Sequence, residues 1–244
     1  MNKLPLLITM FCLSAISGLT EAMDEASEQN FSGSAQLGFI MSTGSSHTTN
    51  ANGKLSGNYK HSKWTYQGFS TFLHDSDHTE NSTHERYEIF GQTQYNYTEK
   101  NYIFINTDWL NDTDDGFDYL WNNTVGYGRQ LYKNTQHGIA ITGQVGPGYR
   151  FQPNDDDDIP DQEITANGSL KFDWDINDIN RVSQVFGTSY AGNETILISN
   201  TAYTAKIYEN ISLQLSFDVR HNTNTPDDSE PPDTITTLNV LYSF

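Results

Sequence analysis

The chain has 244 residues, a formal net charge of −18 and a hydrophobic content of only 35 %. A soluble domain this poor in apolar residues would fill its core badly, yet the chain contains 14 tyrosines and 13 phenylalanines, which disorder does not explain. The negative charge also disfavours nucleic acid as a partner, because like charges repel. A transmembrane β-barrel, with a polar lumen and an apolar lipid face, accommodates both observations.

The N-terminal segment predicts a cleaved secretory signal peptide. Its apolar run, residues 4–19, follows a basic Lys3 and is too short for a spanning helix. Thr20-Glu21-Ala22 fits a small-x-small cleavage pattern, so we expect residues 1–22 to be removed, with Ser17 as the alternative site. The single cysteine of the chain lies within this segment, so the mature chain has no thiol for disulfides, metal binding or catalysis.

The rest of the chain predicts one all-β domain, a 12-stranded up-and-down antiparallel transmembrane barrel over residues 31–244, preceded by a short periplasmic segment at 23–30. The expected strands lie near 31–41, 48–59, 63–73, 84–97, 101–110, 117–131, 137–151, 162–174, 179–191, 195–207, 210–221 and 234–244. Most have the length that a tilted strand needs to cross a bilayer, and the even number is typical of bacterial barrels. Alternation is weakest in the first strand and near 179–191.

Strict alternation of apolar and polar residues carries this prediction. In the segment 211–220 the odd positions are apolar and the even positions polar without exception, a pattern that a helix would scatter around its circumference. The segment 139–151 also alternates but contains Pro147, which removes one ladder donor. Because Gly146 and Gly148 flank the proline, we expect a bulge or a bend there.

The last strand resembles the signal by which outer-membrane barrels are recognised for assembly. Its even positions carry apolar and aromatic residues up to the terminal phenylalanine, and we assign the signal to Leu238, Val240, Tyr242 and Phe244. The implied partners are the barrel-assembly machinery, outer-membrane lipids and lipopolysaccharide, and we expect a monomer.

The connections alternate between short turns and mostly longer polar segments, and this predicts the orientation. The short turns lie near residues 61, 99, 134, 177 and 209, and the longer segments include 74–83, 111–116, 152–161 and 222–233. Such barrels have short periplasmic turns and longer external loops, so we expect both ends of the mature chain in the periplasm.

The four longer connections carry 15 of the 31 acidic residues and no Lys or Arg. The external rim should therefore have a negative potential that salt screens over about 8 Å. One interpretation is a solvated surface. The other is a site for Ca²⁺ or Mg²⁺, or a cation bridge to lipopolysaccharide, at Asp155, Asp156, Asp157 and Asp158, although this run lacks the spacing and the glycine of a calcium loop. We expect no other cofactor.

Catalysis is the least favoured function. The segment around His221 has no serine close by, and Asp75, Asp77 and His78 offer the residue types of an Asp/His site without a supporting pattern. We therefore expect a protein that is not an enzyme.

The expected lumen is rich in amides and in charges of both signs. On the predicted register the charged lumen-lining residues are Lys54, Glu88, Asp108, Arg150, Lys171, Asp173, Asp218 and Arg220. These charges either pair across the lumen and plug it, or line a narrow hydrated pore for small polar solutes or ions. Twelve strands enclose a lumen between that of a filled eight-stranded barrel and a wide porin, so size does not decide.

Several segments resemble, in order, the YdiY-like family of putative salt-induced outer-membrane proteins, a domain of unknown function. They are Gly33-Ser34-Ala35-Gln36-Leu37-Gly38 with Thr43-Gly44, Glu85-Arg86-Tyr87, Lys100-Asn101-Tyr102-Ile103-Phe104, Gly116-Phe117-Asp118-Tyr119, Gly126-Tyr127-Gly128-Arg129, Gly146-Pro147-Gly148-Tyr149-Arg150, Thr204-Ala205-Lys206-Ile207, Val219-Arg220-His221-Asn222 and Leu241-Tyr242-Ser243-Phe244. The resemblance implies a single outer-membrane barrel linked to salt stress and implies no catalytic residues.

Together these observations predict a barrel in the outer membrane of a Gram-negative bacterium that acts as a narrow, porin-like channel. The alternative is a non-conducting envelope protein whose acidic rim binds divalent cations or lipopolysaccharide.

Overall fold

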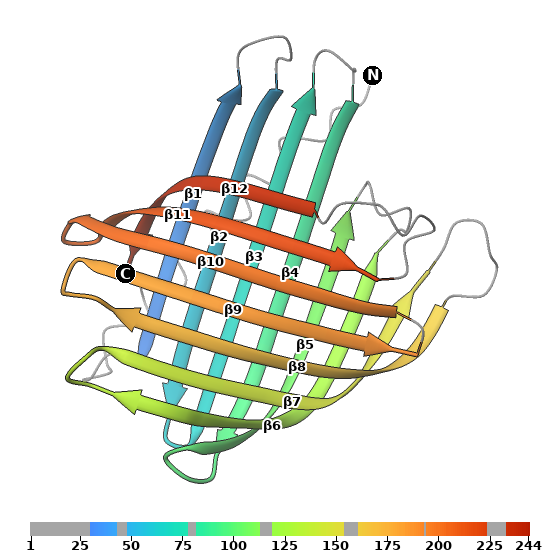
Figure 1. Ribbon diagram of the computed structural model, residues 1–244, viewed down its shortest axis with the longest axis vertical. Coiled ribbons are helices and arrows are strands. Elements are labelled where there is room, and N and C mark those ends of the chain that lie inside the picture. The colour runs from blue at the N-terminus through green and yellow to red at the C-terminus, as the bar shows by residue number, and fades with distance from the viewer. Residues whose placement is uncertain are drawn as a thin grey trace. The chain divides into compact units, whose positions relative to one another are not determined.

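The protein is a closed barrel of twelve antiparallel strands in a computed structural model, in which each strand pairs with its neighbours in the chain and β1 closes the barrel against β12 (Figure 1). The structure describes residues 30–42, 48–77, 82–112, 119–153, 161–192, 194–223 and 233–244. The strands are β1 Phe31–Ser42, β2 Thr48–His61, β3 Trp64–Asp77, β4 Ser82–Asn96, β5 Asn101–Asp112, β6 Leu120–Asn134, β7 Ile139–Gln152, β8 Asp161–Asp175, β9 Asn180–Ala191, β10 Glu194–Tyr208, β11 Ile211–Asn222 and β12 Asp233–Ser243. The predicted fold and strand count are confirmed.

The two ends of the barrel differ in their connections. At one end, which we call the turn end, the chain reverses in short turns that begin after β2, β4, β6, β8 and β10. Side chains close several of these turns: the Asn177 side-chain oxygen accepts hydrogen bonds from the backbone N–H groups of Ile179 and Asn180 at 3.1 and 2.8 Å. β1 starts and β12 finishes at this end. The opposite end, the loop end, carries the longest connections, although β9 and β10 are joined there by only two residues.

Two strand pairs extend further toward the loop end than predicted. β3 and β4 pair as far as Asp77 and Ser82, and β5 continues to Asp112. Asp75, Asp77 and Asp112, which we had assigned to connections, therefore lie in strands. The apolar alternation stops before the backbone ladder does, because ladder hydrogen bonds do not depend on the side chains.

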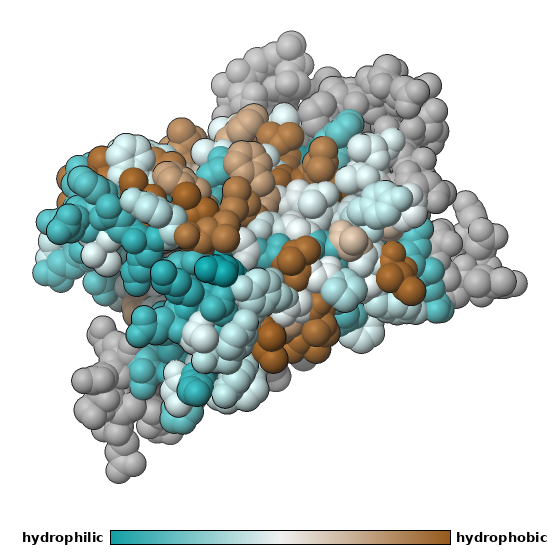
Figure 2. Space-filling view, turned by 60° about the horizontal axis from the view of Figure 1, so that its bottom comes forward, coloured by the Kyte–Doolittle hydropathy of each residue, from teal (hydrophilic) through white to brown (hydrophobic). Residues whose placement is uncertain are grey.

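The outer face of the barrel is apolar, and the inner face is mostly polar. On β11, Leu213, Leu215 and Phe217 are 37–49 % exposed, whereas Ser212 and Ser216 are 8 % exposed. Figure 2 shows hydrophobic groups gathered over the middle of one face. One polar cluster interrupts the outer face, where the Gln184 amide donates to Ser199 at 3.0 Å and accepts from Thr201.

Aromatic side chains on the outer face form two girdles. Near the turn end, the rings of Tyr59 and Tyr66 are 6.1 Å apart, and those of Trp64 and Tyr95 are 5.0 Å apart. Near the loop end, Tyr119 contacts both Trp109 and Phe151, with ring centroids 6.4 and 6.2 Å away. Exposed aliphatic residues lie between the girdles, among them Leu55, Ile89, Ile105, Val125 and Val145. This is the outer surface of a membrane-spanning barrel.

The bulge expected at Pro147 is absent. The register of β7 against β6 is the same on both sides of Pro147, and the irregularity in this pair lies at Leu131, between Gln130 and Tyr132. The glycines instead allow close approach of the backbones, since a β-carbon at Gly146 would lie 2.2 Å from the carbonyl oxygen of Val125.

No helix among the described residues is long and apolar enough to cross a membrane.

We expect Gly146→Ala to destabilise the barrel by about 1–3 kcal/mol, because the added methyl group meets backbone atoms of β6 that cannot rotate away. Urea unfolding in lipid vesicles measures this loss. Gly168→Ala is the matched control, since its β-carbon would make only an ordinary 3.5 Å contact with Thr188. Equal stability of the two variants would contradict close packing at Gly146.

Candidate functional site: the charged lumen

All eight charged residues predicted for the lumen lie at inward positions of their strands. Alternation and cross-strand register place on this face Lys54 of β2, Glu88 of β4, Asp108 of β5, Arg150 of β7, Lys171 and Asp173 of β8, and Asp218 and Arg220 of β11. Sequence reasoning missed further inward charges, among them Arg86, Glu163 and Arg181. Arg86 and Glu163 share the parity of residues already assigned, so alternation could have identified them.

Charges from opposite walls interact across the middle of the barrel. Asp108 on β5 interacts electrostatically with Arg220 on β11, six strands away around the barrel. Asp218 interacts with Lys54 and Glu88, which lie on β2 and β4. In Figure 1, strands β8–β12 cross over β1–β4 at a steep angle, as two facing walls.

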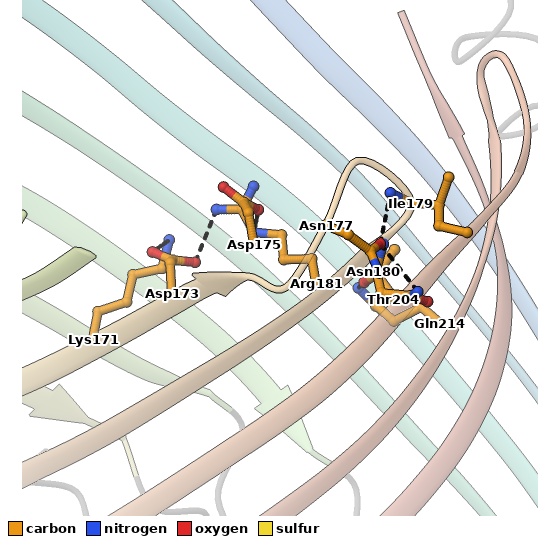
Figure 3. Close-up of polar contacts among 9 residues, drawn as sticks. All are labelled: Lys171, Asp173, Asp175, Asn177, Ile179, Asn180, Arg181, Thr204 and Gln214. Atoms are coloured by element: carbon orange, nitrogen blue, oxygen red, sulfur yellow. Dashed lines mark hydrogen bonds and ion pairs between the residues drawn. The ribbon is translucent and has the colours of Figure 1, made fainter. Parts of the chain in front are cut away.

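A second charged group lies toward the turn end of β8 and β9 (Figure 3). Asp173 accepts from Arg181 at 3.0 Å and pairs with Lys171 at 3.1 Å, and Asp175 lies 3.5 Å from Arg181. The Asp173 side chain is 17 % exposed, whereas those of Lys171 and Arg181 are about half exposed. The two carboxylates and the two cations of this group balance in charge, and both cations remain partly open to solvent.

Arg150 faces inward but does not line an open pore. Its side chain is 2 % exposed, donates to the Ser189 hydroxyl at 3.1 Å and lies 3.7 Å from a Glu163 carboxylate oxygen. Arg150 therefore lies on the lumen side of β7 but is buried there beside Ser189 of β9 and Glu163 of β8. Apolar residues also fill part of the interior: Tyr102 and Phe104 are buried, and the Tyr102 hydroxyl accepts from Gln144 at 2.9 Å.

The lumen contains a cavity of about 610 Å³. Lys54 and Lys171, from opposite walls, both line it, together with Phe69, Phe90 and a set of hydroxyl and amide side chains. A second hollow, of about 830 Å³, lies between rows of outward side chains on β7–β11 and includes His221. His221 thus lies on the outer face, away from the charged lumen.

The remaining predicted sites are only partly described. The side chains of Leu238, Val240, Tyr242 and Phe244 all point outward and are about half exposed, and their role in assembly stays a prediction. Asp155, Asp156, Asp157 and Asp158, the signal peptide and His78 lie outside the described residues. Within the described part of the chain, no group of three or more His, Cys, Asp or Glu residues could hold a metal ion.

The barrel has the fold of outer-membrane channels and translocators. It superimposes on the COG4313 outer membrane channel from Pseudomonas putida F1 with a TM-score of 0.54 and 9 % identity, covering 91 % of this chain and 97 % of that one. The translocator domain of the autotransporter NalP from Neisseria meningitidis gives a TM-score of 0.52 at 10 % identity, with 97 % and 96 % of the two chains covered.

In sequence, the chain is 27 % identical to the uncharacterized protein YdiY of Escherichia coli (strain K12) over 223 residues, which cover 90 % of this chain and 85 % of YdiY. Residues 35–244 match the family described as "Protein of unknown function, DUF481". The resemblance noted from the sequence motifs is thus confirmed, and the chain belongs to the DUF481 family.

Proposed function

We propose that this protein spans the outer membrane of a Gram-negative bacterium as a narrow channel for small polar solutes or ions. The apolar outer face between two aromatic girdles supports the membrane assignment. The short turns and both barrel termini then lie in the periplasm, and the longer acidic connections lie outside the cell.

One observation carries the channel proposal: the lumen holds a polar cavity of about 610 Å³ that side chains from opposite walls line together. A plug would bring oppositely charged groups into contact there. Instead, two like charges, Lys54 and Lys171, line the cavity from opposite walls and repel each other, although Lys171 also pairs with Asp173 at 3.1 Å. A water-filled passage accommodates such a pair better than a dry plug, because bringing two like charges together away from water is costly.

Planar-bilayer recording of the purified full chain tests the proposal. We expect discrete conductance steps smaller than those of wide porins, because charged groups narrow the lumen. Ser56→Trp, which places a large ring in the cavity, should reduce the conductance roughly twofold or more. Leu55→Trp is the matched control, since residue 55 points outward and is 48 % exposed.

The absence of conductance steps, together with no solute flux in liposome swelling, would contradict the channel. That outcome would favour the alternative, an envelope protein whose acidic connections bind divalent cations or lipopolysaccharide. A link to salt stress is compatible with both proposals. Comparing the growth of a deletion strain with that of its parent at low and high salt would test this link.

A further inference from the structure

The cavity of about 610 Å³ has an unusual set of charges for so acidic a protein. Its described lining contains two lysines, Lys54 and Lys171, and no aspartate or glutamate side chain, although the C-terminal residue Phe244, which carries the α-carboxylate, also lines it. The chain as a whole carries 31 acidic residues against 13 basic ones. The volume is in the range of pockets that hold small molecules, roughly 300–1,000 Å³.

Lys54 is one of the residues that line this cavity. Its ammonium nitrogen lies 4.1 Å from the centre of the Phe69 ring, and none of the ion pairs between described residues includes it. The acids that attract it from a distance have donors of their own: Thr71 donates to Glu88 at 3.4 Å, and Asn200 donates to Asp218. A half-buried ammonium group that has no ion pair among the described residues can form a charge-assisted hydrogen bond with an anionic ligand.

The rest of the lining suits a hydroxylated molecule. Ser34 and Ser56 share a hydrogen bond of 2.7 Å at the wall of the cavity, and Gln36 and Gln67 add amide groups. The side-chain oxygen of Asn58 is buried and accepts no hydrogen bond within the described structure. Phe69 and Phe90 stack at 5.0 Å and offer an apolar surface beside these polar groups.

We infer that this cavity binds a small hydroxylated carboxylate, such as a monomeric sugar acid. The inference rests on the proposed channel and names the class of solute that it passes. Lys54 and Lys171 hold the carboxylate, the free oxygen of Asn58 accepts from a hydroxyl group of the ligand, and the apolar face of the sugar ring lies against the two phenylalanines.

The acidic external connections do not rule out an anionic ligand. Lys54 is six residues from the loop end of β2, which corresponds to about 20 Å along the strand. Mobile ions screen a potential over about 8 Å at physiological salt, so the rim slows the entry of an anion more than it weakens binding in the cavity.

Isothermal titration calorimetry of the full chain in detergent micelles tests the site with three sugars of similar size. We expect D-glucuronate to bind, and neutral D-glucose and cationic D-glucosamine to bind at least about tenfold more weakly. Lys54→Met should weaken glucuronate binding about tenfold or more, Lys54→Arg should retain most of it, and rising salt should weaken it. Lys100→Met, in an exposed turn outside the cavity, removes the same charge and should change nothing.

Equal affinity for the three sugars, or an unchanged affinity in Lys54→Met, would overturn the inference. The calorimetric result is independent of conduction. Conductance steps without glucuronate binding would therefore support the channel proposal and contradict the proposed binding site. Glucuronate binding without conductance would support the binding site and contradict the channel proposal.

Discussion

Replacing Ile105 by arginine is expected to destabilise the protein by about 2–4 kcal/mol when it is embedded in a bilayer, because the charge would lie at the middle of the lipid-facing band. Ile105 is the fifth residue of the twelve-residue strand β5, points outward and is 55 % exposed. In water an exposed isoleucine could be replaced almost freely, so the expected cost depends on lipid covering this face.

The neighbouring Asn106 provides the matched control. Asn106→Arg adds the same side chain one residue away but directs it into the polar lumen. We expect its free energy of unfolding to change much less. The measurement is urea unfolding of both variants in lipid vesicles. The fraction of folded protein is determined from gel mobility, which differs between folded and unfolded barrels. Equal losses in the two variants would contradict a lipid-covered outer face.

The strands could be predicted from the sequence because period-two alternation and turn residues are local signals. Even β9 forms where alternation is weak: Phe186 and Tyr190 face outward, and both adjacent strands pair with it along most of its length. Local signals failed at the strand ends, where Asp77 and Asp112 remain in the ladder without any apolar pattern.

The arrangement within the lumen could not be predicted from alternation. Alternation assigns Lys54 and Lys171 to the inner face, but their meeting in one cavity depends on how closely β2 and β8 approach across the barrel. Alternation does place Tyr102 and Phe104 on the face of Asp108, but it does not show that their rings pack within the interior. Tyr102 fits there because a glycine, Gly128, occupies the adjacent position on β6, where a β-carbon would lie 2.1 Å from its ring.

The second large effect is expected at Arg150, whose side chain is almost fully buried between the strands that follow it. We expect Arg150→Met to reduce the free energy of unfolding by about 3 kcal/mol, because it removes charge-assisted contacts to Ser189 and Glu163 while keeping most of the side-chain volume. Urea unfolding in lipid vesicles measures the loss. The effect should exceed that of Arg129→Met, which the exposed Arg129 should tolerate within about 0.5 kcal/mol.

A double variant separates the two contributions to this loss. If part of the cost comes from leaving the Glu163 carboxylate without its cation, then adding Glu163→Gln to Arg150→Met should restore part of the stability. Recovery cannot be complete, because the hydrogen bond to Ser189 is still missing and Glu163 is 41 % exposed and already partly hydrated. An unchanged stability of Arg150→Met would instead mean that this guanidinium is hydrated within the lumen. Arg150 would then line the open lumen, as Lys54 and Lys171 do.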